Sequence, residues 1–129
     1  MNNFAGSFNF SSTFVVNGTA YLVVYGHTWR YNVSSDTWSD IATNPFFKEY
    51  YSVDAIGFAL NNTGYVLHSG QSLYKYDVTN NSWTLVTYYP GSRADNSYKT
   101  TFIIGDKAYI AATSGNYSGN SPLMYSYQE

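Results

Sequence analysis

Residues 29–38 read WRYNVSSDTW, and residues 74–83, which lie 45 positions further along the chain, read YKYDVTNNSW. Each stretch holds a Tyr followed by Asn or Asp, then a short polar segment, and each ends in Trp. Aromatic and branched residues interrupted by Asn, Asp and Ser are typical of two short β-strands joined by a turn. Because the same pattern occurs twice at a fixed distance, the sequence predicts a structural repeat.

A hairpin is expected before each of these stretches, and a third hairpin after them. The strands of the three hairpins are predicted at 13–16 with 20–25, at 55–60 with 64–68, and at 100–104 with 108–113. Each pair is joined by a segment rich in Asn, Gly or Asp. Phe recurs every 44 residues in these runs, at Phe14, Phe58 and Phe102. No window holds the i, i+3, i+4 apolar spacing of an amphipathic helix. We therefore expect an all-β chain.

The repeated unit is expected to hold four antiparallel strands, with the Trp on the outer strand. Four short strands repeated every 40–50 residues are typical of a β-propeller blade. The blades are predicted at about 9–43, about 54–88 and about 98–129, the last lacking its outer strand. The residues that recur between units are expected to anchor the repeat structurally; they are Tyr21, Tyr65, Tyr109, Gly26, Gly70, Gly115, Tyr31, Tyr76, Tyr127, Trp38 and Trp83.

The unit resembles the Kelch-type propeller repeat, in particular the divergent bacterial type related to the central domain of galactose oxidase. The second unit matches most completely, with GYVLHSG at 64–70, LYKYD at 73–77, NNSW at 80–83 and PGSR at 90–93. The resemblance extends from about Phe10 to the end of the chain, with one Gly where the family has two. It implies Kelch-like four-stranded blades. Galactose oxidase chemistry needs copper, a Tyr–Cys crosslink and His ligands, so a chain with no Cys and two His is not expected to share it.

The composition excludes several classes of protein. A net charge of −2 with only six Lys and Arg argues against a nucleic-acid binder. No apolar run is long enough to cross a membrane as a helix. The absence of Cys excludes disulfides and thiolate metal sites, and we expect neither a metal nor another cofactor. The N-terminus lacks the features of a signal peptide. The chain is expected to be soluble, and an extracytoplasmic or secreted location is favoured over the cytoplasm.

Two basic residues are the candidate ligand contacts. Lys48 and Arg93 lie 45 residues apart, and each follows a Pro that ends a predicted fourth strand. The resemblance implies that this connection lies on the face where a propeller pocket opens. Aromatic residues flank both positions and complete the candidate site; they are Tyr50, Tyr51 and Tyr98. Such rings suit a carbohydrate or a peptide, but they suit packing between blades equally well, and the two charges are equally compatible with solvated loops.

No catalytic constellation is expected in this chain alone. The two histidines, His27 and His68, are interpreted as exposed strand-end residues, and the segment ending Asp36-Thr37-Trp38 as a turn between strands. No Ser/His/Asp motif and no phosphate-binding loop occurs. We expect a non-catalytic module that binds a protein or a carbohydrate. The alternatives are part of a sugar-active enzyme whose site forms only in a complete propeller, and a propeller fragment with no function of its own.

The length predicts that the ring is incomplete. At about 45 residues per blade, 129 residues supply just under three blades, whereas propellers close with about four to eight. The missing blades are expected from a second copy of the chain, which would give about six, or from a larger chain. In the dimer, residues 1–8 are expected to add the outer strand that the last blade lacks.

Overall fold

The computed structural model describes residues 11–24, 26–45, 55–68, 72–88, 99–113 and 122–129. These residues form three antiparallel sheets, and within each sheet the strands that follow one another in the chain pair with each other. The first sheet contains β1 (Ser11–Val16), β2 (Thr19–Val24), β3 (His27–Asn32) and β4 (Thr37–Thr43). The second contains β5 (Ala55–Leu60), β6 (Thr63–His68), β7 (Ser72–Asp77) and β8 (Ser82–Tyr88), and the third β9 (Lys99–Ile104), β10 (Lys107–Thr113) and β11 (Pro122–Gln128). The prediction of an all-β chain is confirmed.

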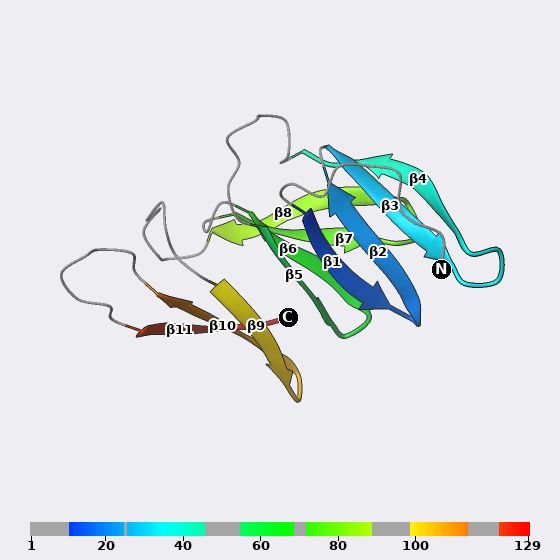
Figure 1. The fold of residues 1–129 in the computed structure, drawn as a ribbon. Coiled ribbons are helices and arrows are strands. Elements are labelled where there is room, and N and C mark those ends of the chain that lie inside the picture. The colour runs from blue at the N-terminus through cyan, green and yellow to red at the C-terminus, as the bar shows by residue number, and fades with distance from the viewer. Residues whose placement is uncertain (1–10, 25, 46–54, 69–71, 89–98, 114–121) are drawn as a thin grey trace.

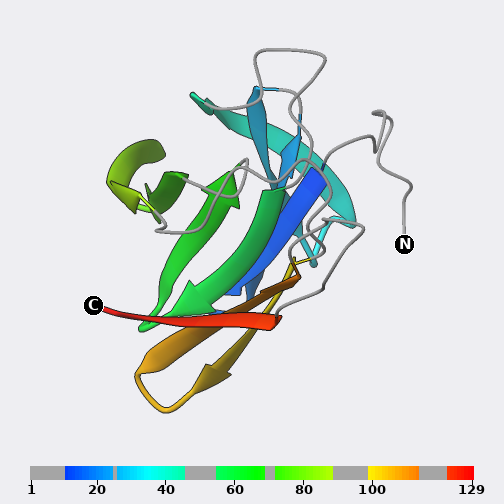
Figure 2. The ribbon, with the colours of Figure 1, turned by 90° about the vertical axis from the view of Figure 1, so that its left-hand side faces the viewer.

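The sheets follow one another in space in the order of the chain (Figures 1 and 2). The inner strand β1 lies beside β5, and β5 lies beside β9. The two tryptophans that recur between repeats, Trp38 on β4 and Trp83 on β8, lie on edge strands, as the repeat predicts. Among the described residues, no helix has the length and hydropathy that crossing a membrane requires.

The hairpin turns are one residue shorter than predicted. Asn17 and Gly18 have φ of 50° and 73°, and Asn61 and Asn62 have φ of 47° and 59°, so both central residues of each turn are left-handed. This geometry matches the twist of the strands that a two-residue turn joins. Gly105 has φ of 61° in the third hairpin. The strands β2, β6 and β10 therefore begin one residue earlier than expected, at Thr19, Thr63 and Lys107.

The turns between β3 and β4 and between β7 and β8 are built in the same way. The Asn32 side chain accepts hydrogen bonds from the Ser34 and Ser35 backbone N–H groups, at 2.9 and 3.2 Å. Asp77 accepts the corresponding bonds from Thr79 and Asn80, at 2.8 and 3.1 Å. Bonds from the Asn80 side chain and from these backbone N–H groups lower the pKa of Asp77. The left-handed residue that ends each turn, Asp36 (φ 53°) or Asn81 (φ 51°), accepts a bond from the preceding Tyr31 or Tyr76. The interpretation of the Asp36 segment as a turn is confirmed.

Each sheet carries a stacked aromatic pair, which in the first two sheets lies on the face toward the next sheet. The pairs are Phe14–Tyr21, Phe58–Tyr65 and Phe102–Tyr109, with ring centroids 5.2, 5.1 and 5.2 Å apart and interplanar angles of 15°, 9° and 6°. The partners of each pair lie directly opposite each other in the register of the inner hairpin. Cross-strand aromatic pairs of this kind stabilise a hairpin and present a flat apolar surface.

A second kind of aromatic pair, from the outer two strands, covers the stacked pair of the preceding sheet. Tyr76 and Trp83 of the second sheet form a tilted pair, 4.9 Å apart at 40°. Tyr76 packs edge-on against Tyr21, at 5.5 Å and 61°, and Trp83 packs edge-on against Phe14, at 6.0 Å and 83°. Trp83 Nε1 also donates a hydrogen bond of 2.9 Å to Oγ1 of the fully buried Thr28. These contacts join the first sheet to the second.

The junction between the second and third sheets repeats this arrangement without the Trp. Tyr127 of β11 packs edge-on against Tyr65, at 5.4 Å and 60°. The Tyr65 hydroxyl donates a 2.8 Å bond to Oε1 of Glu129. Ala108 and Ile110 complete the cluster from β10 and are buried. In the described part of the chain the third sheet has three strands. Residues 1–8, which we expect to supply a fourth, lie outside the described residues.

Candidate functional site

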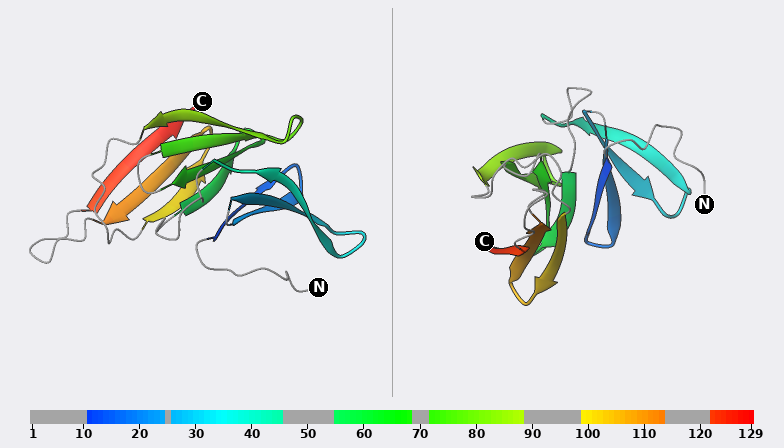
Figure 3. Two further views of the ribbon diagram at one scale, coloured as in Figure 1. Left: turned by 90° about the horizontal axis from the view of Figure 1, so that it is seen from above. Right: turned by 60° about the vertical axis from the view of Figure 1, so that its left-hand side comes forward.

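The strand directions define two ends of the stack. The hairpin turns described above lie at one end, and the connections β2–β3, β4–β5, β6–β7, β8–β9 and β10–β11 leave from the other, here called the loop end. Because the sheets are stacked in register, the loop ends of all three lie on the same side of the molecule (Figure 3). Equivalent strand ends of neighbouring sheets therefore lie on one side of the molecule.

The candidate ligand contacts lie outside the described residues. Lys48, Tyr50 and Tyr51 belong to the segment between β4 and β5, and Arg93 and Tyr98 to the segment between β8 and β9. Both segments start from the loop end, and they occupy the same place in two successive repeats. Gly70 and Gly115, two of the predicted repeat anchors, also lie outside the described residues, whereas Gly26 has φ of 80°. A single Gly therefore supplies the left-handed residue at the β2–β3 connection.

A polar cluster that the sequence did not reveal lies at the loop end of the first sheet. His27 Nδ1 is 2.8 Å from Asp40 Oδ2, with side chains 49% and 39% exposed. Asn44 is buried; its side chain donates a 3.0 Å bond to the His27 carbonyl, and its backbone N–H donates a 2.7 Å bond to the Gly26 carbonyl. The residues 45 positions later are Ser72, Leu85 and Tyr89, so the cluster does not recur and the repeat gives no signal for it.

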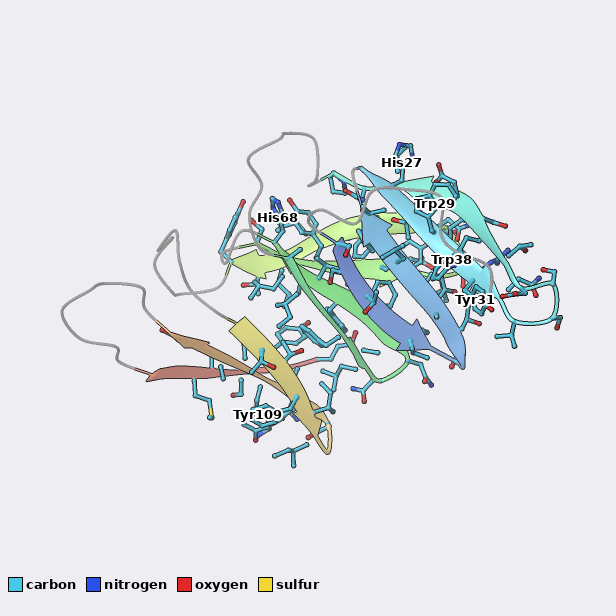
Figure 4. The ribbon with its side chains drawn as sticks, viewed as in Figure 1. His27, Trp29, Tyr31, Trp38, His68 and Tyr109 are labelled. Carbon is cyan, nitrogen blue, oxygen red and sulfur yellow. The ribbon has the colours of Figure 1, made fainter. Side chains whose placement is uncertain are left out.

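The two histidines lie at the same end of the stack but on different kinds of strand. His27 is the first residue of β3 and His68 is the last residue of β6, so both lie at strand ends as expected (Figure 4). No group of three His, Cys, Asp or Glu side chains that could hold a metal ion occurs among the described residues. The exposed imidazole and carboxylate of His27 and Asp40 can donate and accept hydrogen bonds to a polar ligand.

Three of the anchor tyrosines, Tyr31, Tyr65 and Tyr76, have raised pKa values because their hydroxyls lie between the sheets or in turns. Burial raises the pKa of Tyr76 to about 12. Burial, followed by the hydrogen bond to Glu129, raises the pKa of Tyr65. In the exposed turn, the hydrogen bond to Asp36 raises the pKa of Tyr31. The folded chain therefore keeps these hydroxyls protonated at a pH where an unfolded chain would ionise them.

This difference predicts a loss of stability at alkaline pH. An unfolded tyrosine ionises near pH 10, whereas folded Tyr76 holds its proton to about pH 12. Between these values the unfolded state binds fewer protons, so the free energy of unfolding should fall as the pH rises. Urea unfolding measured between about pH 8 and about pH 11 tests this. Tyr76→Phe should reduce the slope of the free energy of unfolding against pH, and Tyr88→Phe, at an exposed position, should not. Equal slopes for the two variants would contradict the prediction.

Comparison with known proteins gives a fold but no family. No family model matches the sequence, and no curated protein matches it. Among solved structures, the chain is similar to the structure of YjhT, with a TM-score of 0.62 and 12% identity. The alignment covers 90% of this chain and 50% of that one, so the chain spans about half the length of YjhT. At this identity the likeness concerns the fold alone. The chain thus has an all-β fold of antiparallel sheets that resembles half of YjhT.

Proposed function

We propose that the chain is a non-catalytic binding module made of Kelch-like propeller blades, which recognises a protein or carbohydrate ligand at the loop end. The observation that carries this proposal is the repeated junction between sheets. The pairs Phe14–Tyr21 and Phe58–Tyr65 are each covered by the corresponding Tyr of the next sheet, at 5.5 and 5.4 Å. A packing unit used twice in succession is what stacked propeller blades require. The fold likeness to YjhT supports the same arrangement.

The binding surface follows from this arrangement. Successive blades place equivalent connections side by side, and two of those connections contain a basic residue with neighbouring tyrosines. Guanidinium and ammonium groups donate hydrogen bonds to hydroxyl, carbonyl and carboxylate oxygens, while tyrosine rings provide apolar area with a polar hydroxyl. Lys48, Arg93, Tyr50, Tyr51 and Tyr98 are therefore the residues proposed to contact the ligand. His27 and Asp40 add exposed polar groups at the same end of the first sheet.

The proposal is tested by screening the full chain on glycan and peptide arrays and by measuring affinity for each ligand found. The double variant Lys48→Ala/Arg93→Ala should bind at least about tenfold more weakly, because each lost charged hydrogen bond costs about 1.5–3 kcal/mol. A matched control, Lys75→Ala/Lys107→Ala, removes the same net charge from β7 and β10 and should bind as the unmodified chain does. Unchanged affinity of the first variant for every ligand would refute the site. Chemical conversion of a bound sugar would favour the enzyme alternative.

A further inference from the structure

The third sheet carries an uncovered copy of the surface that joins the other sheets. The Phe102–Tyr109 pair has the same stacked geometry as the two covered pairs. Phe102, however, is 39% exposed, whereas Phe14 and Phe58 are 4% and 6% exposed. Ile104 is 62% exposed, although its counterparts Val16 and Leu60 are each 2% exposed.

The same contrast holds on the strand that ends the sheet. Met124 occupies the position in the third sheet that Leu73 holds in the second and Thr28 in the first. Each of the three pairs with the corresponding residue of the neighbouring strand, which is Ala111, Leu67 or Val23. Leu73 and Thr28 are buried against the next sheet, whereas Met124 is 65% exposed. The third sheet thus presents a continuous apolar face made of Phe102, Ile104, Tyr109 and Met124, here called the open face. Exposed apolar faces of this kind are typical of interaction sites.

The first sheet carries the element that covers such a face inside the chain. Tyr31 and Trp38 form a tilted pair, 5.0 Å apart at 44°, which matches the Tyr76–Trp83 pair at 4.9 Å and 40°. Thr28 points toward the second sheet, because its hydroxyl bonds to Trp83. Successive side chains of a strand point to opposite faces, so Tyr31, three residues after Thr28, and its cross-strand partner Trp38 lie on the side that points away from the second sheet. Val15 is on that side too and is 59% exposed; its counterpart Ala59 packs against the core between the first two sheets.

We propose that the open face binds the first sheet of a second copy of this chain, with Tyr31 and Trp38 seated on Phe102 and Tyr109. The contact continues the interface that the chain already forms between its own sheets, and both surfaces of that interface are present on every copy. Two copies joined head to tail form two identical contacts and a ring of six sheets. This inference rests on the propeller-like stacking in the proposed function, but not on the ligand or on the residues proposed to bind it.

The chemistry at the new contact differs from the internal one in one respect. Within the chain, Trp83 Nε1 donates to the Thr28 hydroxyl. At the contact between copies, the position of Thr28 is taken by Met124, which offers a polarisable thioether to the Trp38 ring. The four residues of the open face are uncharged, although Lys107 lies opposite Ile104 in the register of β9 and β10 and shares this side of the sheet. The association should therefore be driven mainly by apolar burial.

The test measures the mass of the full chain in solution by light scattering coupled to size exclusion. The unmodified chain should elute as two copies of 14.5 kDa each. Ile104→Glu places a charge on the open face and Val15→Glu places one on the opposing face, so each variant alone should be monomeric. Both residues are exposed in the single chain, so both variants should fold, as circular dichroism can verify. Leu85→Glu, at an exposed apolar position of the middle sheet, should remain dimeric.

Mixing the two monomeric variants decides the orientation. The intact first sheet of the Ile104→Glu chain can dock on the intact third sheet of the Val15→Glu chain, so an equimolar mixture should regain dimers through one contact. A monomeric unmodified chain, a mass other than two copies, or a mixture that stays monomeric would overturn the proposal. So would a Val15→Glu chain that stays dimeric while the Ile104→Glu chain dissociates, because that result indicates that two open faces pair with each other. A monomer that still binds its ligand through Lys48 and Arg93 would refute this contact and leave the proposed function standing.

Discussion

Replacing Phe14 by Ala is expected to lower the free energy of unfolding by about 3–5 kcal/mol, which is the usual cost of truncating a buried phenylalanine. Phe14 is 4% exposed and stacks on Tyr21 within its own hairpin. It also contacts Tyr76 and Trp83 of the second sheet, each at 6.0 Å between ring centroids. The truncation therefore leaves a cavity between two sheets, and a loss of this size is a large fraction of a typical domain's stability.

Equilibrium unfolding in urea, followed by tryptophan fluorescence, measures this effect. The milder variant Phe14→Leu should cost less and keeps the experiment informative where the Ala variant does not fold. Leu85→Ala provides the control, because it removes an apolar side chain that is 40% exposed on the outer strand of the second sheet, and it should cost less than about 1 kcal/mol. If Phe14→Ala were no more destabilising than Leu85→Ala, the aromatic junction would not hold the two sheets together.

Replacing Gly57 by Ala is expected to cost about 2–3 kcal/mol, the upper part of the range for overpacking a close-packed site. Gly57 lies on β5 where this strand approaches β1 of the neighbouring sheet. A Cβ atom at this position would lie 2.6 Å from Ser12 Oγ and closer still to the carbonyl oxygen of Thr13. The carbonyl belongs to the backbone of a paired strand, so relief requires the two sheets to move apart.

A companion substitution separates the two contacts. The Ser12 hydroxyl is buried and has no hydrogen-bond partner among the described residues, so Ser12→Ala removes a polar group that is costly to bury. In the double variant, Ser12→Ala should recover about 1 kcal/mol of the Gly57→Ala loss, while the conflict with Thr13 remains. Gly105→Ala is the control for backbone strain, since Gly105 has φ of 61° and no neighbouring atoms within reach of a Cβ. Thermal unfolding that is unchanged by Gly57→Ala would show that β1 and β5 do not approach as described.

Much of the fold could be predicted because its determinants recur. Phe14, Phe58 and Phe102 occupy the same position in three hairpins, and Trp38 and Trp83 the same position on two edge strands. Repetition every 44 or 45 residues therefore predicted the strands, their antiparallel order and the three strands that the third sheet has among the described residues. The turns were predicted one residue too long, because the backbone dihedral angles, rather than the composition, decide how many residues lie outside the hydrogen-bonded pairing of the two strands.

Features that occur once, or that depend on a neighbouring sheet, could not be predicted in this way. The His27–Asp40 pair and the hydrogen bond from Asn44 to the His27 carbonyl have no counterpart in the second repeat, so comparing the repeats could not reveal them. Gly57 occupies a position held by Thr13 and Thr101 in the other repeats, and the sequence does not reveal that another strand's backbone fills the space beside it. The ligand contacts Lys48 and Arg93 remain predictions from the repeat and the resemblance.

Aromatic pairs repeated along the chain stack its sheets in succession and, as we propose, leave the last pair for a second copy. A crystal structure of the full chain can show both features at once. We expect Tyr76 edge-on to Tyr21 near 5.5 Å, Tyr127 edge-on to Tyr65 near 5.4 Å, and the Phe102–Tyr109 pair covered by Tyr31 and Trp38 of another copy. Sheets separated from one another, with the Phe14–Tyr21 pair facing solvent, would contradict it.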